Sequence, residues 1–466
     1  MKTNVTTRPF GIRDKVGYLF GDFGNDFTFI FSTMMLMKFY TDVMGVSAGV
    51  VGLVITIARI VDAFTDVAMG RICDRTRPTE AGKFKPWLMR MCIPVALASF
   101  LIYQSALAGA AMWVKIAYLF VTYILWGSVF YTAINIPYGS MASAVSPNPD
   151  DRQSLSTFRS MGAMFAGTII GVMLPLIAYE KVDGVETLVG TRVTLAAGIC
   201  SLLAIGCYVL CYFMVTERVR TEQSTEKQDS VGQMLASALK NRALIAIIAA
   251  SIVMLLSQLT MQNMSGYVYP DYYNSAAAQS ASTLMMMGGM LFAAALVKPI
   301  AKRIGKTEVS VLSSLFAAAV NVILFFIRPE NVWVYAGMQL LSWIGLGMFS
   351  MVTWALITDV IDYSEIKNGK REDGTVYALY SFARKLGQAA SAGLIGFLLE
   401  IIGYSTATKA DAAVQKGIFD ISVLVPALGF LLLALILWFW YPLHKKQVDA
   451  NVEALKQKHR GEQIEQ

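Results

Sequence analysis

Long apolar blocks alternate with short polar segments along the whole chain. A helix needs about 20 predominantly apolar residues to cross the hydrocarbon core of a bilayer. Twelve runs of this kind can be placed, with centres near residues 28, 60, 97, 125, 170, 203, 253, 291, 317, 345, 388 and 430. The pattern therefore predicts an all-α polytopic membrane protein with twelve transmembrane helices.

Lysine and arginine are concentrated in alternate polar segments. The N-terminal segment, 71–85 and 302–306 are rich in both residues, whereas 41–47 and 268–280 contain neither. Because basic loops stay on the cytoplasmic side of a membrane, both termini are expected in the cytoplasm. The expected location is the cytoplasmic (inner) membrane of a bacterium.

The longest polar break divides the apolar runs into two groups of six. We predict an N-terminal six-helix bundle over 1–215, a cytoplasmic central loop over 216–240, a C-terminal six-helix bundle over 241–443 and a cytoplasmic tail over 444–466. Two related halves of this kind are typical of secondary transporters, which bind their substrates near the middle of the membrane.

Composition argues against several other classes of protein. Hydrophobic residues make up 56% of the chain and charged residues 15%, against about 25% charged residues in soluble domains. The net charge of +7 is explained by basic loops beside the spans, so nucleic-acid binding is not expected. Both histidines, His444 and His459, lie in the tail, and neither a CxxC pair nor a P-loop is present. An enzyme, a resident cofactor and ATP-driven transport are therefore not expected, which leaves an ion gradient as the driver.

The second span, in the stretch IARIVDAFTDVAMGRICDRT (57–76), carries charge near its middle. Asp62 and Asp66 lie one helical turn apart on one face, and Arg59 lies one turn before Asp62. Each such charge costs roughly 2.5–3.5 kcal/mol at the centre of a membrane helix, so a compensating function is indicated. Two carboxylates form an oxygen ligand set for a small alkali cation or share a proton. The alternative is a buried ion-pair triad that serves only helix packing.

Polar side chains also interrupt the first and fourth spans. Asp22 and Asp26 lie one turn apart in the first span. Asp26 is the deeper of the two and the better ligand candidate, whereas Asp22 fits a cap or a pairing residue. In the fourth span, Tyr131, Thr132 and Asn135 fall within about one turn, just before a proline that disturbs the helix.

Two basic residues and one aromatic residue complete the set of candidates. Arg159 opens the fifth span and Lys385 lies inside the eleventh. The alternative for both is that the side chain extends to the membrane surface. Trp126 shares a segment with the polar residues of the fourth span and is a candidate for stacking on a sugar ring.

In combination, these motifs resemble the glycoside–pentoside–hexuronide:cation symporters of the major facilitator superfamily, which include melibiose and glucuronide carriers. The matching segments cover nearly the whole chain and include 21–27, 39–45, 57–76, 82–87, 135–140 and 359–389. The resemblance implies the major facilitator fold, with two pseudo-symmetric six-helix bundles and both termini in the cytoplasm. It also implies a secondary active transporter that couples a sugar to Na+ or H+ by alternating access.

The resemblance further implies where the cation and the inner gate lie. The cation site falls on Asp62, Thr65, Asp66 and Thr132, with Na+ at Asp62 and Asp66. Melibiose carriers commonly have an amide at the position of Thr65, so the choice between Na+ and H+ stays open. The cytoplasmic gating motif falls on Gly70, Asp74 and Arg75, with Arg59 beside the cation site.

The implied sugar site departs from that of melibiose carriers. It falls on Asp26, Asn25, Tyr131, Asn135, Arg159 and Lys385, with Trp126 nearby. Asn25 replaces a basic residue, Asn135 replaces an acid, and Gly139 replaces a tryptophan. A pocket that lacks one acid but keeps Arg159 and Lys385 is less negative, which suggests an anionic sugar such as a hexuronide or a sulfonated sugar.

Other functions of the same fold stay open at this point. They are export of a product of sugar catabolism, transport of a lysolipid, and a sensor that does not transport. The expected partners are a small sugar and membrane lipid, and the expected state is a monomer.

Overall fold

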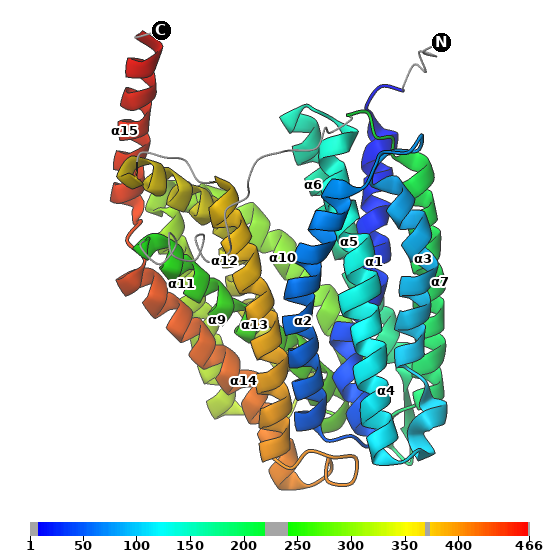
Figure 1. Cartoon of the computed structure of the whole chain (residues 1–466). Helices are drawn as coiled ribbons and strands as arrows, with labels where there is room; N and C mark the ends of the chain where they lie inside the picture. The colour runs from blue at the N-terminus through cyan, green and yellow to red at the C-terminus, as the bar shows by residue number, and fades with distance from the viewer. Residues whose placement is uncertain (1–7, 220–240, 369–372, 465–466) are drawn as a thin grey trace. The chain divides into compact units, whose positions relative to one another are not determined.

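The computed structural model describes residues 8–219, 241–368 and 373–464 (Figure 1). The chain divides into two compact units. One comprises Met1–Glu226 with Ile395–Asp411, and the other comprises Lys227–Leu394 with Ala412–Gln466. Most of the predicted central loop, 220–240, lies outside the described residues.

The first unit is helical and contains the segments that carry most of the candidate residues. Its elements are α1 (Ile12–Asp42), α2 (Ala48–Arg75), α3 (Lys85–Ile102), the 3₁₀ turn η1 (Ser105–Gly109), α4 (Met112–Ile124), the π-helical turn η2 (Leu125–Tyr131), α5 (Thr132–Val145), α6 (Pro149–Ala178) and α7 (Gly190–Met214). Ser47 and Asn148 accept backbone N–H groups at the starts of α2 and α6, as N-cap residues do. Helix α1 packs against both α6 and α7.

The fourth predicted span is one long helical run built from α4, η2 and α5. Sequence reasoning placed its disturbance at Pro137, but α5 continues through Pro137, and the irregular turn is η2, which comes earlier. A π-helical turn widens the helix by about one residue and is frequently found at functional sites. Here it changes which side chains face α2.

A short β-hairpin, β1 (Tyr179–Val182) and β2 (Val185–Leu188), joins α6 to α7 and was not predicted. Its two turn residues, Asp183 and Gly184, have φ angles of 51° and 82°. Positive φ at both central residues is the requirement of the type I′ turn that two-residue hairpins favour.

The segment Ile395–Asp411 joins the first unit through a buried polar cluster at the end of α1. Lys38 Nζ lies 2.9 Å from Asp42 Oδ2 and donates to the Tyr404 hydroxyl at 2.5 Å. Tyr404 in turn donates to Asp42 Oδ1 at 2.8 Å. Because Lys38 is only 1% exposed, its ammonium group is stable there only with these partners.

The second unit is also helical. Its elements are α9 (Arg242–Tyr267), the π-helical turn η3 (Val268–Tyr272), α10 (Ala276–Ile304), α11 (Lys306–Ile327), α12 (Val332–Asn368), α13 (Asp373–Ile401, up to Leu394), α14 (Ala412–Leu435), the π-helical turn η4 (Ile436–Trp440) and α15 (Lys445–Ile464). Helix α11 packs against α12 and α14, around a core that includes Ala317, Phe349 and Phe430.

The described residues account for the predicted spans. Ten helical segments are long and apolar enough to cross a membrane. Helices α1 and α13, with 31 and 29 residues, exceed the required length as well, and charged residues such as Asp22 and Asp26 in α1 and Arg384 and Lys385 in α13 interrupt their apolar runs. The all-α architecture and the expected spans are therefore confirmed. The predicted tail forms the polar helix α15.

Candidate functional site

Two carboxylates on α2 face two hydroxyls on the run from η2 to α5. Ser128 Oγ donates to Asp62 Oδ1. Thr132 Oγ1 donates to Asp66 Oδ1 at 2.8 Å. The partners in both pairs are 66 residues apart, so the side chains one turn apart on α2 match side chains one turn apart on the facing helix. The structure thus brings Asp62, Asp66 and Thr132 together and adds Ser128.

Arg59 supplies a positive charge at one end of this cluster. Its Nη1 lies 3.3 Å from Asp62 Oδ2, with both side chains largely buried. The guanidinium group also lies over the ring of Phe29, 5.0 Å from its centroid. Asp62 therefore accepts a hydrogen bond on each carboxylate oxygen, one from a hydroxyl and one from a cation.

Thr65 contacts the backbone of Asp62, and Gly127 borders its carboxylate. Thr65 Oγ1 donates to the backbone oxygen of Asp62 at 3.1 Å, which leaves the lone pairs of the hydroxyl oxygen available to a ligand. A methyl group added at Gly127 would lie 3.6 Å from Asp62 Oδ1. Glycine therefore keeps space open beside the carboxylate.

The turn η2 accounts for the position of the two hydroxyls. The backbone N–H of Thr132 donates to the carbonyl of Gly127, five residues earlier, and the Thr132 hydroxyl contacts the same oxygen at 3.2 Å. Trp126 lies fully buried, with its ring centroid 5.5 Å from Tyr123 and 5.6 Å from Tyr131. In this conformation Trp126 packs between the tyrosines, and its role in stacking on a sugar stays a prediction.

Asn25 links three helices beside the hydroxyl–carboxylate pairs. Its side-chain nitrogen donates to Asn135 Oδ1 at 3.3 Å, and its side-chain oxygen accepts from the Tyr208 hydroxyl at 2.8 Å. Asn25 is 1% exposed, so these bonds are not replaced by water. Helix α5 thus carries both Thr132, which contacts the α2 carboxylates, and Asn135, which contacts α1.

Arg159 forms an ion pair with Asp22. Arg159 Nε lies 2.9 Å from Asp22 Oδ1, and the Arg159 side chain is 39% exposed. A Cβ atom at Gly139 would lie 3.6 Å from Arg159 Nη1, so glycine at this position leaves that side of the guanidinium open. Tyr138 lies under the guanidinium group at 5.3 Å.

Asp26 lies one turn from Asp22 on α1 and is half-buried. Among the described residues, its carboxylate forms no ion pair or hydrogen bond. A carboxylate in that state is an acceptor for ligand hydroxyl groups. Lys385 lies half-buried on α13, in the second unit, so its predicted part in the site stays a prediction.

The predicted gating residues lie at the end of α2. Gly70 is half-buried, and Asp74 and Arg75 are exposed. The following loop is held by Glu217, whose carboxylate accepts the backbone N–H groups of Lys83, Phe84 and Lys85 at 2.7, 2.9 and 2.7 Å. Sequence reasoning missed Glu217, because a carboxylate more than 130 residues away leaves no local signal.

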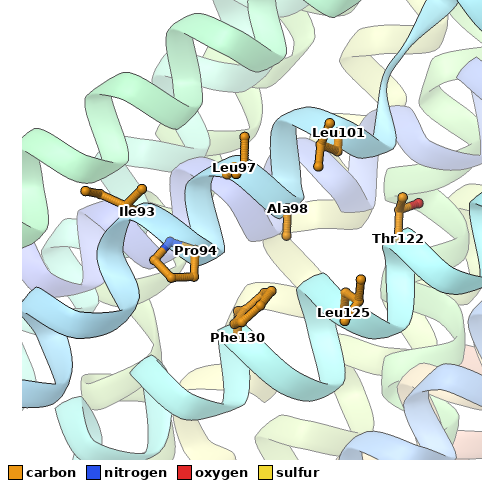
Figure 2. Close-up of a pocket in the computed structure, with 8 residues that line it drawn as sticks. All are labelled: Ile93, Pro94, Leu97, Ala98, Leu101, Thr122, Leu125 and Phe130. Atoms are coloured by element: carbon orange, nitrogen blue, oxygen red, sulfur yellow. The ribbon is translucent and has the colours of Figure 1, made fainter.

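An apolar cavity of about 320 Å³ lies on the other side of η2 (Figure 2). It is bounded by α3 and the α4–η2 run, and its lining residues are Ile93, Pro94, Leu97, Ala98, Leu101, Thr122, Leu125 and Phe130. The Thr122 hydroxyl donates to the Tyr118 carbonyl of its own helix. The surface of the cavity is apolar, so it is not a candidate for a sugar site.

Sequence reasoning missed Ser128, and for Asp22 it left the pairing partner unnamed. Ser128 lies four residues before Thr132, the same spacing as Asp62 and Asp66, and this repeated spacing was the available signal. Asp22 was weighed as a cap or a pairing residue, and the structure shows it as the partner of Arg159.

Comparison with known protein families shows the family to which the chain belongs. The family model described as MFS/sugar transport protein matches residues 17–445. The chain belongs to this family. It is therefore a multi-pass inner-membrane carrier and not an enzyme. The "Uncharacterized symporter YjmB" of Bacillus subtilis is 30% identical over 97% of both chains.

Other relatives and a solved structure agree with this placement of the carrier. The "Glucuronide carrier protein homolog" of Escherichia coli is 29% identical over 93% of each chain. The "Putative sulfoquinovose importer" of Salmonella typhimurium is 29% identical over 98% of this chain and 96% of that protein. A crystal structure of a D-xylose-proton symporter superposes with a TM-score of 0.64 at 14% identity, covering 92% of this chain and 97% of that one. The fold is thus the major facilitator fold.

Proposed function

We propose that this carrier couples the transport of an anionic sugar to Na+ bound at Asp62 and Asp66. The observation that carries the proposal is the matched register of two hydroxyls against two carboxylates. Oxygen atoms are the ligands that hard cations prefer, and here four side-chain oxygens and nearby carbonyls converge from two helices. Arg59 compensates the charge of Asp62, with its Nη1 3.3 Å from Asp62 Oδ2.

Coupling follows from the helix that both clusters share. A cation between α2 and the η2–α5 run fixes the position of Thr132. Asn135 lies three residues farther along α5 and accepts a hydrogen bond from Asn25 on α1. A shift of α5 that accompanies cation binding therefore also moves Asn135, which belongs to the proposed sugar site. By thermodynamic linkage, a cation that raises sugar affinity must itself bind more tightly when sugar is present.

The anionic substrate is supported by the surroundings of Arg159. Asp22 occupies the Nε side of the guanidinium, whereas the Nη1 side is next to Gly139. A carboxylate or sulfonate on a sugar forms charge-assisted hydrogen bonds with a guanidinium group, while Asp26 accepts from sugar hydroxyls. Relatives named for glucuronide and sulfoquinovose carry the same class of charge in their substrates.

The carrier is proposed to work as a monomer in the lipid bilayer. The hydroxyl–carboxylate pairs and the Arg159 cluster each lie within one unit of one chain, so neither needs a second copy. When the carrier is reconstituted at less than one chain per vesicle on average, uptake per chain should therefore equal that at higher protein density. Loss of uptake at that dilution would show that a dimer is required.

Uptake into proteoliposomes tests the function. The wild type should accumulate glucuronides or sulfonated sugars in response to an inward Na+ gradient and transport neutral galactosides poorly. The variants Asp62→Asn and Asp66→Asn should lose Na+-driven accumulation but keep sugar exchange. Equal accumulation of neutral sugars would reject the anionic substrate, and an unchanged Na+ dependence in both variants would reject the cation site. Export of lysolipid from the vesicles instead would favour the lysolipid carrier.

A further inference from the structure

Ser128 has two acceptors for its single proton. Its hydroxyl donates to Asp62 Oδ1 and lies 3.4 Å from the carbonyl oxygen of Ala58, both on α2. The side chain is 2% exposed, so water does not compete for the proton. A serine hydroxyl turns about its C–O bond and can therefore donate to either acceptor in turn.

Thr132 repeats this arrangement one turn farther along. Its hydroxyl donates to Asp66 Oδ1 at 2.8 Å and lies 3.2 Å from the carbonyl of Gly127. Each hydroxyl of the cluster is thus placed between one carboxylate oxygen and one backbone carbonyl. In an unbroken α-helix the Gly127 carbonyl would accept from residue 131, but the π-helical turn moves that bond to Thr132.

We propose that Ser128 is a cation ligand, and that both hydroxyls change their hydrogen-bond acceptor when the cation binds. Without a cation, each hydroxyl donates to a carboxylate and so stabilises its charge. When Na+ occupies the space between the carboxylates, the proton of Ser128 turns to Ala58 and that of Thr132 to Gly127. The hydroxyl oxygens then direct their lone pairs at the ion. This inference rests on the proposed cation site.

The direction in which Ser128→Ala changes Na+ affinity distinguishes a cation ligand from a residue with a structural role. If Ser128 only stabilises the cation-free carboxylate, Ser128→Ala removes a competitor and tightens Na+ binding. If Ser128 is a ligand, the same change removes one of the ion's oxygens and weakens binding. A hydrogen bond or contact to a charged group contributes about 1.5–3 kcal/mol, so the loss should be about tenfold or more in the Na+ concentration at half-maximal binding.

The experiment measures Na+ binding to purified Ser128→Ala, Ser128→Thr and Asp62→Asn, with Ser140→Ala as the matched control. The Ser140 hydroxyl donates to the Ile136 carbonyl of its own helix, and within the described part of the chain it forms no hydrogen bond to a carboxylate. Affinity should fall about tenfold in Ser128→Ala and stay near wild type in Ser128→Thr and Ser140→Ala.

Two results overturn the proposal. Unchanged or tighter Na+ binding in Ser128→Ala, together with loss in Asp62→Asn, rejects Ser128 as a ligand and leaves the cation site in place. Undiminished binding in Asp62→Asn rejects the cation site itself. If Ser128→Ala does not fold, Ser128→Cys decides, because a thiol is a poor ligand for Na+ and should weaken binding in the same direction.

Discussion

Replacing Arg59 by glutamine should make the stability of the carrier depend more strongly on Na+ than that of the wild type does. Arg59 and Asp62 are 14% and 11% exposed, with Nη1 and Oδ2 3.3 Å apart, so the pair is largely removed from water. Removing one partner of a buried ion pair costs about 3–5 kcal/mol, because the remaining charge is left uncompensated. Na+ bound beside Asp62 replaces the lost charge and should restore much of that free energy.

The free energy of unfolding that Na+ restores to Arg59→Gln can be calculated from its binding. A ligand that binds only the folded protein stabilises it by about 2.7 kcal/mol at a concentration one hundred times its dissociation constant. The unfolding midpoint of Arg59→Gln in detergent should therefore fall well below that of the wild type in choline chloride and recover most of the difference in saturating NaCl. Thermal unfolding followed by intrinsic fluorescence measures both values.

Arg192→Gln is the matched control. Arg192 pairs with Glu180 at 2.6 Å, but both side chains are more than 40% exposed, so this pair contributes about 1 kcal/mol or less. Its loss should change stability little and equally in both salts. The reasoning about Arg59 is refuted if NaCl, relative to choline chloride, raises the unfolding midpoint of Arg59→Gln no more than it raises that of the wild type.

Three further changes have defined outcomes. Gly127→Ala places a methyl group 3.6 Å from Asp62 Oδ1, which is an ordinary contact, so the protein should fold normally. Because the methyl group occupies space beside the carboxylate, Na+ should bind at least several-fold more weakly. Titration with Na+ measures the affinity, and an unchanged affinity would contradict this prediction. Gly139→Ala covers the Nη1 side of Arg159 and should raise the KM for glucuronide uptake while exchange of a neutral sugar changes little; an equal effect on both sugars would contradict a contact with the anionic group. Glu217→Ala removes the acceptor of three backbone N–H groups at the start of α3 and should lower the free energy of unfolding by about 2–4 kcal/mol. Glu217→Gln keeps one acceptor oxygen, so its free energy of unfolding should fall less. Equal decreases in the two variants would argue against this capping role.

The spans were predictable because membrane insertion leaves a strong local signal. The twelve runs are apolar over about 20 residues, and the bilayer allows few structures other than helices. Asp62 and Asp66 were predictable for the same reason, since a charge inside such a run is costly and so stands out. Their helical spacing placed them on one face, as the structure has them.

Three features of the site were harder to predict from the sequence: Ser128, Glu217 and the pairing of Arg159 with Asp22. A serine in a membrane helix is common and carries little cost, and the π-helical turn that directs Ser128 at Asp62 has no simple sequence pattern. Glu217 and Asp22 acquire their roles from partners more than 130 residues away. Those contacts depend on how the helices pack, which hydrophobic periodicity alone does not determine.

Equilibrium binding of radioactive Na+ to the purified carrier tests the central claim most directly. The account predicts saturable binding of one Na+ per chain, abolished in both Asp62→Asn and Asp66→Asn and retained in Arg192→Gln. Wild-type binding in both aspartate variants would place the ion elsewhere and contradict the proposed coupling site.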